Sequence, residues 1–217
     1  MADTLTQLIT KVQALLGDTT GTFFTTSIVT AGIRQALSEW NLRAPNHIAT
    51  TIAAIADQYE YELTDAANVP IEIMDVLERG DGNNELDISI GYDQYVEDER
   101  TFIRLRAPIT ANEVIIVRYT ANHTINGLDS ALTSTLMAKD DQAMIDGGAF
   151  YSIVTRATAR IETVNVSGGQ PDDYQSIAVL YKASFDSRLG LAARSRRMPV
   201  GEPDQRAWND SYHNWDQ

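Results

Sequence analysis

The hydrophobic pattern of this 217-residue chain changes period twice, and this constrains the fold more than any other feature. Apolar residues recur every three or four positions up to about residue 45, alternate with polar residues across the middle, and return to helical spacing after about residue 140. Neighbouring strands with no helices between them favour antiparallel pairing. The sequence therefore predicts an α+β fold: a small bundle of about four helices with an inserted antiparallel β domain and an extended C-terminal tail.

Two short amphipathic helices are predicted before residue 45. The apolar positions of the first are Leu5, Leu8, Ile9, Val12, Leu15 and Leu16, and Gly17 is a natural stop. Those of the second are Ile28, Val29, Ile33, Leu37 and Trp40, with Thr25 or Thr26 as the cap and Pro45 as the end. A polar turn at 18–22 joins them, so we expect an antiparallel helical hairpin.

The middle of the chain is predicted to be a set of short strands. Alternation or strand-like composition marks 48–54, 59–63, 71–79, 86–92, 101–106 and 113–120. Turn residues separate them, among them the run Gly80-Asp81-Gly82-Asn83-Asn84. We expect an antiparallel meander or a small sandwich here.

Two further helices are predicted after the strands. One begins at Asp140 or Asp141 and runs to about Val164, with apolar candidates Met144, Ile145, Tyr151, Val154, Ala157 and Ile161. The pair Gly147-Gly148 near its start fits either a distorted first turn or close packing against a neighbouring helix. The other begins at Pro171-Asp172-Asp173 and has the stripe Tyr174, Ile177, Ala178, Tyr181, Phe185 and Leu189. We therefore expect a helical bundle from 1–45 and 123–194, a β domain at 46–122 and a tail at 195–217.

The tail differs in chemistry from the rest of the chain. An arginine cluster spans the start of the tail, and two prolines interrupt any helix. The aromatic residues of the tail lie among polar residues. The residues predicted to dock onto a partner are Arg194, Arg196, Arg197, Trp208, Tyr212 and Trp215. Aromatic side chains in such a segment are typical anchors for a pocket on another surface. Folding back onto its own domain is the alternative.

The charge is negative and uneven. The net charge is −13, and residues 60–99 hold 13 acids against one base, Arg79. Tight sequence-specific DNA binding needs a basic face, so this balance argues against it. An acidic surface suits either a solvated face or a surface that DNA slides past.

Few catalytic or metal-binding arrangements are available. The chain has no cysteine, which excludes disulfides, thiolate zinc sites and cysteine catalysis. His47, His123 and His213 are far apart, and neither a Gly-x-Ser-x-Gly elbow nor a phosphate-binding loop occurs. Residues 81–87 resemble the opening of a calcium loop, but Leu86 stands where glycine is required and Tyr92 where glutamate is required. We predict no catalytic residues, no cofactor, no metal site and no enzyme activity.

The N-terminal residues lack the basic flank and apolar block of a signal peptide, and no apolar run is long enough for a membrane span. We expect a cytoplasmic protein, or a virion protein assembled in the host cytoplasm.

The order of these features resembles the head–tail connector adaptors, or head-completion proteins, of tailed bacteriophages. The stretch 5–18 is similar to their first helix, and Phe24-Thr25 precedes a helix that ends in an aromatic residue, Trp40. The segment ending Gln58-Tyr-Glu-Tyr-Glu-Leu63 looks like their first hairpin, and 108–119 like their last strand. Helices starting near Ala143 and Asp172 complete a resemblance that covers about 1–194.

The resemblance implies a structural subunit of the virion neck. It implies a ring of about twelve copies beneath the portal protein, joined to a downstream neck or tail protein, through which the genome passes without sequence-specific binding. The tail would reach the portal or a neighbouring subunit. The residues that would face the channel, or keep the β domain soluble, are Glu60, Glu62, Asp87, Asp93, Glu97, Asp98 and Glu99.

Two other functions fit the pattern less well. One is a tail-completion or gatekeeper protein of the same neck. The other is a carbohydrate- or protein-binding module on the β domain, which predicts a surface cluster of Tyr59, Tyr61, Tyr92 and Tyr95.

Overall fold

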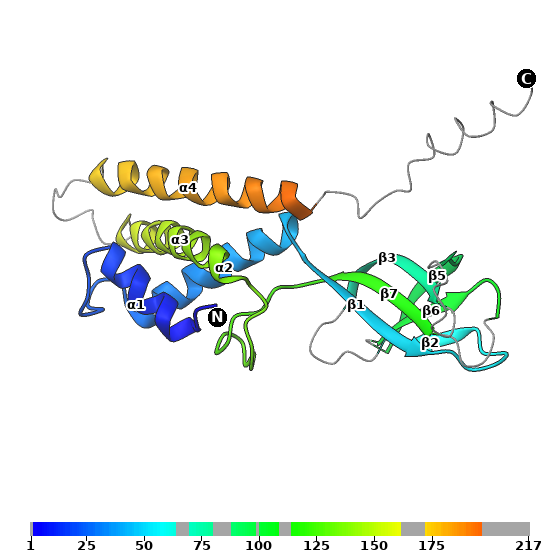
Figure 1. The fold of residues 1–217 in the computed structure, drawn as a ribbon. Helices are drawn as coiled ribbons and strands as arrows, with labels where there is room; N and C mark the ends of the chain where they lie inside the picture. Colours follow the sequence, from blue (N-terminus) through cyan, green and yellow to red (C-terminus); the bar gives the residue numbers. More distant parts are fainter. Residues whose placement is uncertain are drawn as a thin grey trace, which may run out of the picture.

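The chain forms a helical bundle and a pair of antiparallel sheets, which lie at opposite ends of the molecule (Figure 1). The computed structural model describes residues 2–63, 70–79, 88–98, 100–108, 114–161 and 172–196. The helices are α1 Leu5–Leu15, α2 Thr26–Arg43, the short 3-10 helix η1 Ala138–Asp140, α3 Asp141–Ile161 and α4 Asp172–Arg196. The strands are β1 Asn46–Ala53, β2 Glu60–Glu62, β3 Pro70–Arg79, β4 Ile88–Ser89, β5 Tyr92–Glu97, β6 Arg100–Leu105 and β7 Val114–Ala121. The predicted α+β class is confirmed, and the tail beyond Arg196 lies outside the described residues.

The turn between α1 and α2 is organised by one buried carboxylate. Asp18 accepts the backbone N–H groups of Thr22, Phe23 and Phe24 at 3.1, 2.7 and 2.6 Å, and the Thr20 hydroxyl at 3.1 Å. The hydrogen bond from Phe24, helped by its neighbours, holds the pKa of Asp18 below the ordinary value. The polar turn expected at 18–22 thus has one side chain at its centre, and Thr25 follows it as the N-cap of α2.

The bundle core is built where α1, α2, α3 and α4 meet. The largest side chains buried there are Trp40, Phe185, Leu8, Ile33 and Met144. The Trp40 and Phe185 ring centroids lie 6.5 Å apart. Four residues of the predicted stripes are not in this core, since Leu15, Val154 and Ile177 are 39%, 42% and 44% exposed and Ala157 is exposed as well.

Glycines allow α2 and α3 to approach closely. A Cβ added to Gly147 would lie 2.8 Å from the Cβ of Ala36, and one added to Gly148 would lie 2.9 Å from Cγ1 of Ile33. On the facing helix, a Cβ on Gly32 would lie 2.7 Å from the carbonyl oxygen of Gly148. Of the two interpretations of Gly147-Gly148, close helix packing is therefore the one that the structure supports.

The β region consists of two sheets that share one core. The first has the order β1-β7-β3-β4 and the second β2-β6-β5. Tyr119 and Ile115 from the first sheet are buried in the same cluster as Ile103, Leu105 and Tyr61 from the second. Of the two predicted arrangements, the meander is wrong, because β1 pairs along its whole length with β7, from Asn46↔Ala121 to Ala53↔Val114.

The single strand predicted over 86–92 is wrong. The chain has β4 at Ile88–Ser89, which pairs with β3, and β5 at Tyr92–Glu97, which pairs with β6. Between them the chain crosses from one sheet to the other: the Ile90 N–H donates to Val76, and the carbonyl of Gly91 accepts from Arg106. Alternation reports a strand but not which sheet it joins, so the crossing leaves no sequence signal.

Candidate interaction surfaces

α4 is attached to the bundle through a half-buried polar network. Lys182 Nζ lies 3.0 and 3.1 Å from the two carboxylate oxygens of Glu39 on α2, and 2.6 Å from Asp186. The hydroxyl of Tyr151 on α3 donates to the same Glu39. Lys182 also sits 5.2 Å from the ring centroid of Phe185. One carboxylate therefore joins three helices.

The pKa values of this network follow from its contacts. Burial alone would raise the pKa of Glu39, but the hydrogen bonds from Tyr151 and Lys182 hold it below the ordinary value. Burial, together with the acceptor Glu39, raises the pKa of Tyr151. Glu39 and Lys182 are therefore both charged at neutral pH, and their hydrogen bonds, with that of Tyr151, connect α2, α3 and α4.

A second polar network also attaches α4 to α3. Asp146 of α3 accepts from Ser184 at 2.6 Å and from Gln142 at 2.8 Å, and Arg188 approaches it at 3.4 Å. The apolar stripe predicted the buried side of α4. It did not predict either polar network, since the residues of each network are far apart in the sequence.

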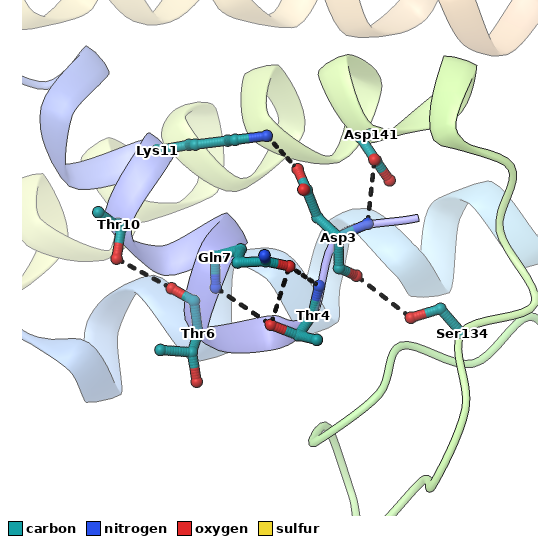
Figure 2. A network of polar contacts seen from close by, with 8 residues as sticks. All are labelled: Asp3, Thr4, Thr6, Gln7, Thr10, Lys11, Ser134 and Asp141. Atoms are coloured by element: carbon teal, nitrogen blue, oxygen red, sulfur yellow. Dashed lines mark hydrogen bonds and ion pairs between the residues drawn. The ribbon is translucent and has the colours of Figure 1, made fainter. Parts of the chain in front are cut away.

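The N-terminal segment is fixed to α3 and to the segment that follows β7 (Figure 2). The Asp3 N–H donates to Asp141 at 3.0 Å, the Ser134 hydroxyl donates to the Asp3 carbonyl at 3.2 Å, and Lys11 pairs with the Asp3 carboxylate. Desolvation raises the pKa of Asp141. These contacts join the start of α1 to the bundle.

Four of the seven predicted acidic residues lie on one face of the three-stranded sheet. Residues paired across antiparallel strands share a face, and the pairs Glu60↔Arg104, Glu62↔Phe102, Asp93↔Arg104 and Glu97↔Arg100 place all four on the same side. We call this side the outer sheet face. Asp98 lies in the turn after β5 with φ of 49°, and Asp87 and Glu99 lie outside the described residues.

Two arginines of β6, and Arg106 just after it, stand between these acids. Arg100 approaches Glu62 at 3.5 Å, Arg104 approaches Glu60 at 3.7 Å, and Arg106 approaches Asp93 at 3.0 Å. A stacked pair, Tyr95 and Phe102 with centroids 5.2 Å apart, lies between the charges. The sequence prediction named the acids and missed the arginines, although the spacing Arg100-x-Phe102-x-Arg104 in a strand gives the signal. Among the described residues, four acids and three arginines leave the outer sheet face only weakly negative.

The tyrosines do not form the surface cluster that a carbohydrate-binding module predicts. Tyr61 is 4% exposed and its hydroxyl donates to the carbonyls of Ile55 and Gln58. The Tyr92 hydroxyl donates to the carbonyl of Ile73 at 2.9 Å. Tyr95 stacks within the outer sheet face, and only Tyr59 is substantially exposed. Two of the four rings therefore serve the core of the β region.

An open groove of about 500 Å³ lies where the bundle meets the β region. We call it the junction groove. One wall is α2 and the other is the segment that follows β7. Its lining residues are Arg34, Leu37, Ser38, Asn41, Leu42, Pro45, Thr120, Asn122, His123 and Asp129.

Hydrogen bonds hold the two walls of the junction groove together. The His123 N–H donates to Asn41 Oδ1 at 2.8 Å, and the Asn41 amide donates to the His123 carbonyl at 3.4 Å. Arg34 binds Asp129 through Nε and Nη2, the latter at 2.6 Å. This pairing lowers the pKa of Asp129. His123 is buried and bonds Thr135, as expected for a structural histidine.

Of the residues predicted to dock onto a partner, Arg194 is exposed on α4 and Arg196 is the last residue of that helix. The helix thus continues two residues past the predicted boundary at 194. Arg197, Trp208, Tyr212 and Trp215 lie outside the described residues.

No group of three or more potential metal ligands occurs among the described residues, and the calcium-like segment 81–87 lies outside them. Within the same residues, no helix combines the length and apolar character needed to cross a bilayer.

The sequence matches no protein-family model and no curated protein. Among solved structures, the chain is similar to a chain in the neck of an empty gene transfer agent particle, with 12% identity, a TM-score of 0.31, and coverage of 80% of this chain and 87% of that one. It is also similar to a chain in the virion of a native gene transfer agent particle, with 11% identity, a TM-score of 0.33, and coverage of 83% and 89%.

Proposed function

We propose that this chain is a structural subunit of a phage neck, an adaptor that forms a ring beneath the portal, joins head to tail and lets DNA pass. The observation that carries the proposal is the element order. A helical hairpin is followed by sheets whose first and last strands pair, and then by two more helices. This is the order that the resemblance to connector adaptors implies.

The surface of α4 also supports assembly. Val179, Leu180 and Leu191 are 62%, 69% and 64% exposed, although the helix is already docked on the bundle. Burying large apolar side chains contributes on the order of 1.5–3 kcal/mol each, so such a helix favours contact with another subunit. Head-to-tail contacts of this kind close into a ring when the rotation between subunits permits.

The outer sheet face supports a role beside DNA. Free arginines on a channel wall would bind phosphates and slow the passage of the genome. Here Arg100, Arg104 and Arg106 are each paired with a carboxylate of the same sheet. We propose that the outer sheet face lies toward the lumen. There, the pairing with carboxylates leaves, on the described part of this face, no line of unpaired arginines to which the DNA phosphates could bind.

The test is the mass of the native particle, measured alone and with a portal protein by native mass spectrometry. We expect a closed ring in at least one of the two samples. A monomer in both samples at high concentration contradicts the adaptor role.

Deleting 197–217 refines that test. Because the described part of α4 ends at Arg196, the deletion should leave the thermal unfolding of the protein unchanged while docking onto the portal or the neighbouring subunit is lost. Association that persists at full strength would show that the aromatic tail is not needed for docking.

A further inference from the structure

The junction groove exposes apolar surface that the chain does not cover. Leu42 on its rim is 83% exposed, and Leu37 and Pro45 extend the apolar lining. Its volume of about 500 Å³ falls within the range of roughly 300–1,000 Å³ that is usual for sites enclosing a small ligand. An aromatic side chain therefore fits in the junction groove. Its binding would remove from water the apolar surface of the ring and that of the groove.

The polar lining of the groove suits an aromatic side chain with a polar edge. The Ser38 hydroxyl and the amide of Asn122 lie in the lining and offer acceptors for an indole N–H. The ion pair of Arg34 and Asp129 is open to water, with its side chains 51% and 61% exposed. It can therefore contact charges of either sign on an incoming segment.

The chain itself contains a segment of this chemistry. Residues 197–217 hold Trp208 and Trp215 among polar residues of both signs, such as Arg206 and Asp210. α2 and α4 both run toward the end of the bundle from which β1 leaves, so this segment starts from the end at which the groove lies (Figure 1). Trp208 and Trp215 are 12 and 19 residues beyond Arg196, and these lengths span up to about 40 Å and about 63 Å when extended.

We infer that the junction groove of one copy receives the aromatic tail of a second copy of this chain. Pro199 and Pro203 restrict the backbone before Trp208, and a restricted segment turns back onto its own bundle less readily than a flexible one. A tail-to-groove contact is heterologous, so each copy offers one tail and one groove, and repetition closes a ring. The inference rests on the proposed function and names the neighbouring subunit as the partner of the tail.

The absence of cysteine makes the contact testable by disulfide trapping in the full chain. Copies carrying Ser38→Cys are co-expressed with copies carrying Asn214→Cys, the residue beside Trp215. Both changes are conservative in size and leave the aromatic anchors in place. A disulfide forms only when two Cα atoms come within about 4.4–6.8 Å. After mild oxidation, the dimer is measured on a non-reducing gel.

The matched control is Ser27→Cys with Asn214→Cys. Ser27 is also an exposed serine of α2 but lies at the opposite end of the helix, outside the groove lining. Each single variant expressed alone measures the disulfides that form between identical copies. We expect several-fold more mixed dimer with Ser38→Cys than with Ser27→Cys.

Two results would overturn the inference. One is a mixed-dimer yield with Ser38→Cys no higher than that with Ser27→Cys. The other is a double variant, Ser38→Cys/Asn214→Cys, that forms only an internal disulfide, because the groove would then hold the tail of its own chain.

The native mass of the same samples separates the two proposals. A ring without the cross-link refutes the tail-to-groove contact and leaves the adaptor role standing. A monomer both alone and with the portal refutes the adaptor role itself.

Discussion

Gly147 of α3 lies so close to Ala36 of α2 that a Cβ added to it would stand 2.8 Å from the Ala36 Cβ. The same Cβ would also stand 2.8 Å from a ring carbon of Phe185 on α4. The position where α2, α3 and α4 meet thus has no room for a methyl group. Its tolerance to substitution measures how tightly the bundle is packed.

Gly147→Ala should destabilise the protein by about 1–3 kcal/mol, since overpacking outweighs the gain in helix propensity. Gly190→Ala is the matched control: it is also a helical glycine, on α4, but a Cβ there meets nothing within 4 Å. It should stabilise by about 0.5–1 kcal/mol. Urea unfolding monitored by circular dichroism measures both. Equal shifts in the two variants would refute the close packing.

Asp18→Asn should lower stability at neutral pH, because the three N–H groups lose an anionic acceptor. The pKa of Asp18 is lowered in the folded state, so its contribution is present above its unfolded pKa, near 3.8, and is lost as pH falls through the folded value. The gap between the urea midpoints of wild type and variant should therefore be wide at pH 7, begin to shrink near pH 3.8 and close as pH falls through the folded pKa. A gap that does not depend on pH would contradict this.

Lys182→Met should weaken the attachment of α4 and reduce stability by about 1–3 kcal/mol, because Glu39 loses a charged hydrogen-bond donor. Arg106→Gln removes a cation from an ion pair whose two side chains are both about two-thirds exposed, and should change stability little. Thermal unfolding compares the two. An equal loss in both variants would show that Lys182 is no better coupled than a surface residue.

Thr4→Ala should lower the free energy of unfolding by about 1 kcal/mol, because α1 loses the side chain of its N-cap. The Thr4 side chain accepts from the Gln7 N–H at 3.4 Å, and Gln7 Oε1 accepts from the Thr4 N–H at 2.8 Å (Figure 2). Thr6→Ala is the control, since Thr6 takes part in this network only through its backbone carbonyl. Hydrogen exchange of the α1 amides should quicken in the first variant alone. Faster exchange in both would show that the effect does not come from the N-cap, since alanine is the better helix former at either position.

The helices were predictable because their signals are local. Thr25, Trp40 and Pro45 delimit α2 within a short stretch, and the structure places its ends at Thr26 and Arg43. The pairing of β1 with β7 carries no such signal, since the partners Asn46 and Ala121 are 75 positions apart in the sequence. The link from Glu39 to Lys182 spans 143 positions and is hidden for the same reason.

The candidate surfaces also combine features that local sequence predicts with features that depend on contacts between distant residues. Acidic side chains of 60–99 were visible as a composition bias, and alternation explains why four of them share the outer sheet face. Their neutralisation by β6 depends on register, which fixes Arg104 opposite Glu60 and Asp93. The junction groove combines α2 with a segment about 80 positions later, so no pattern within either one reveals it.

The pairing of β1 with β7 means that the chain leaves the bundle and returns to it at adjacent points. Asn46 and Ala121 face each other in the ladder, and neighbouring strands lie about 4.8 Å apart. A short turn would bridge that gap, so the helices need nothing from the intervening residues to stay connected. We therefore expect that changes in the length of the β region would refit one end of the molecule to a different neighbour without moving a helix.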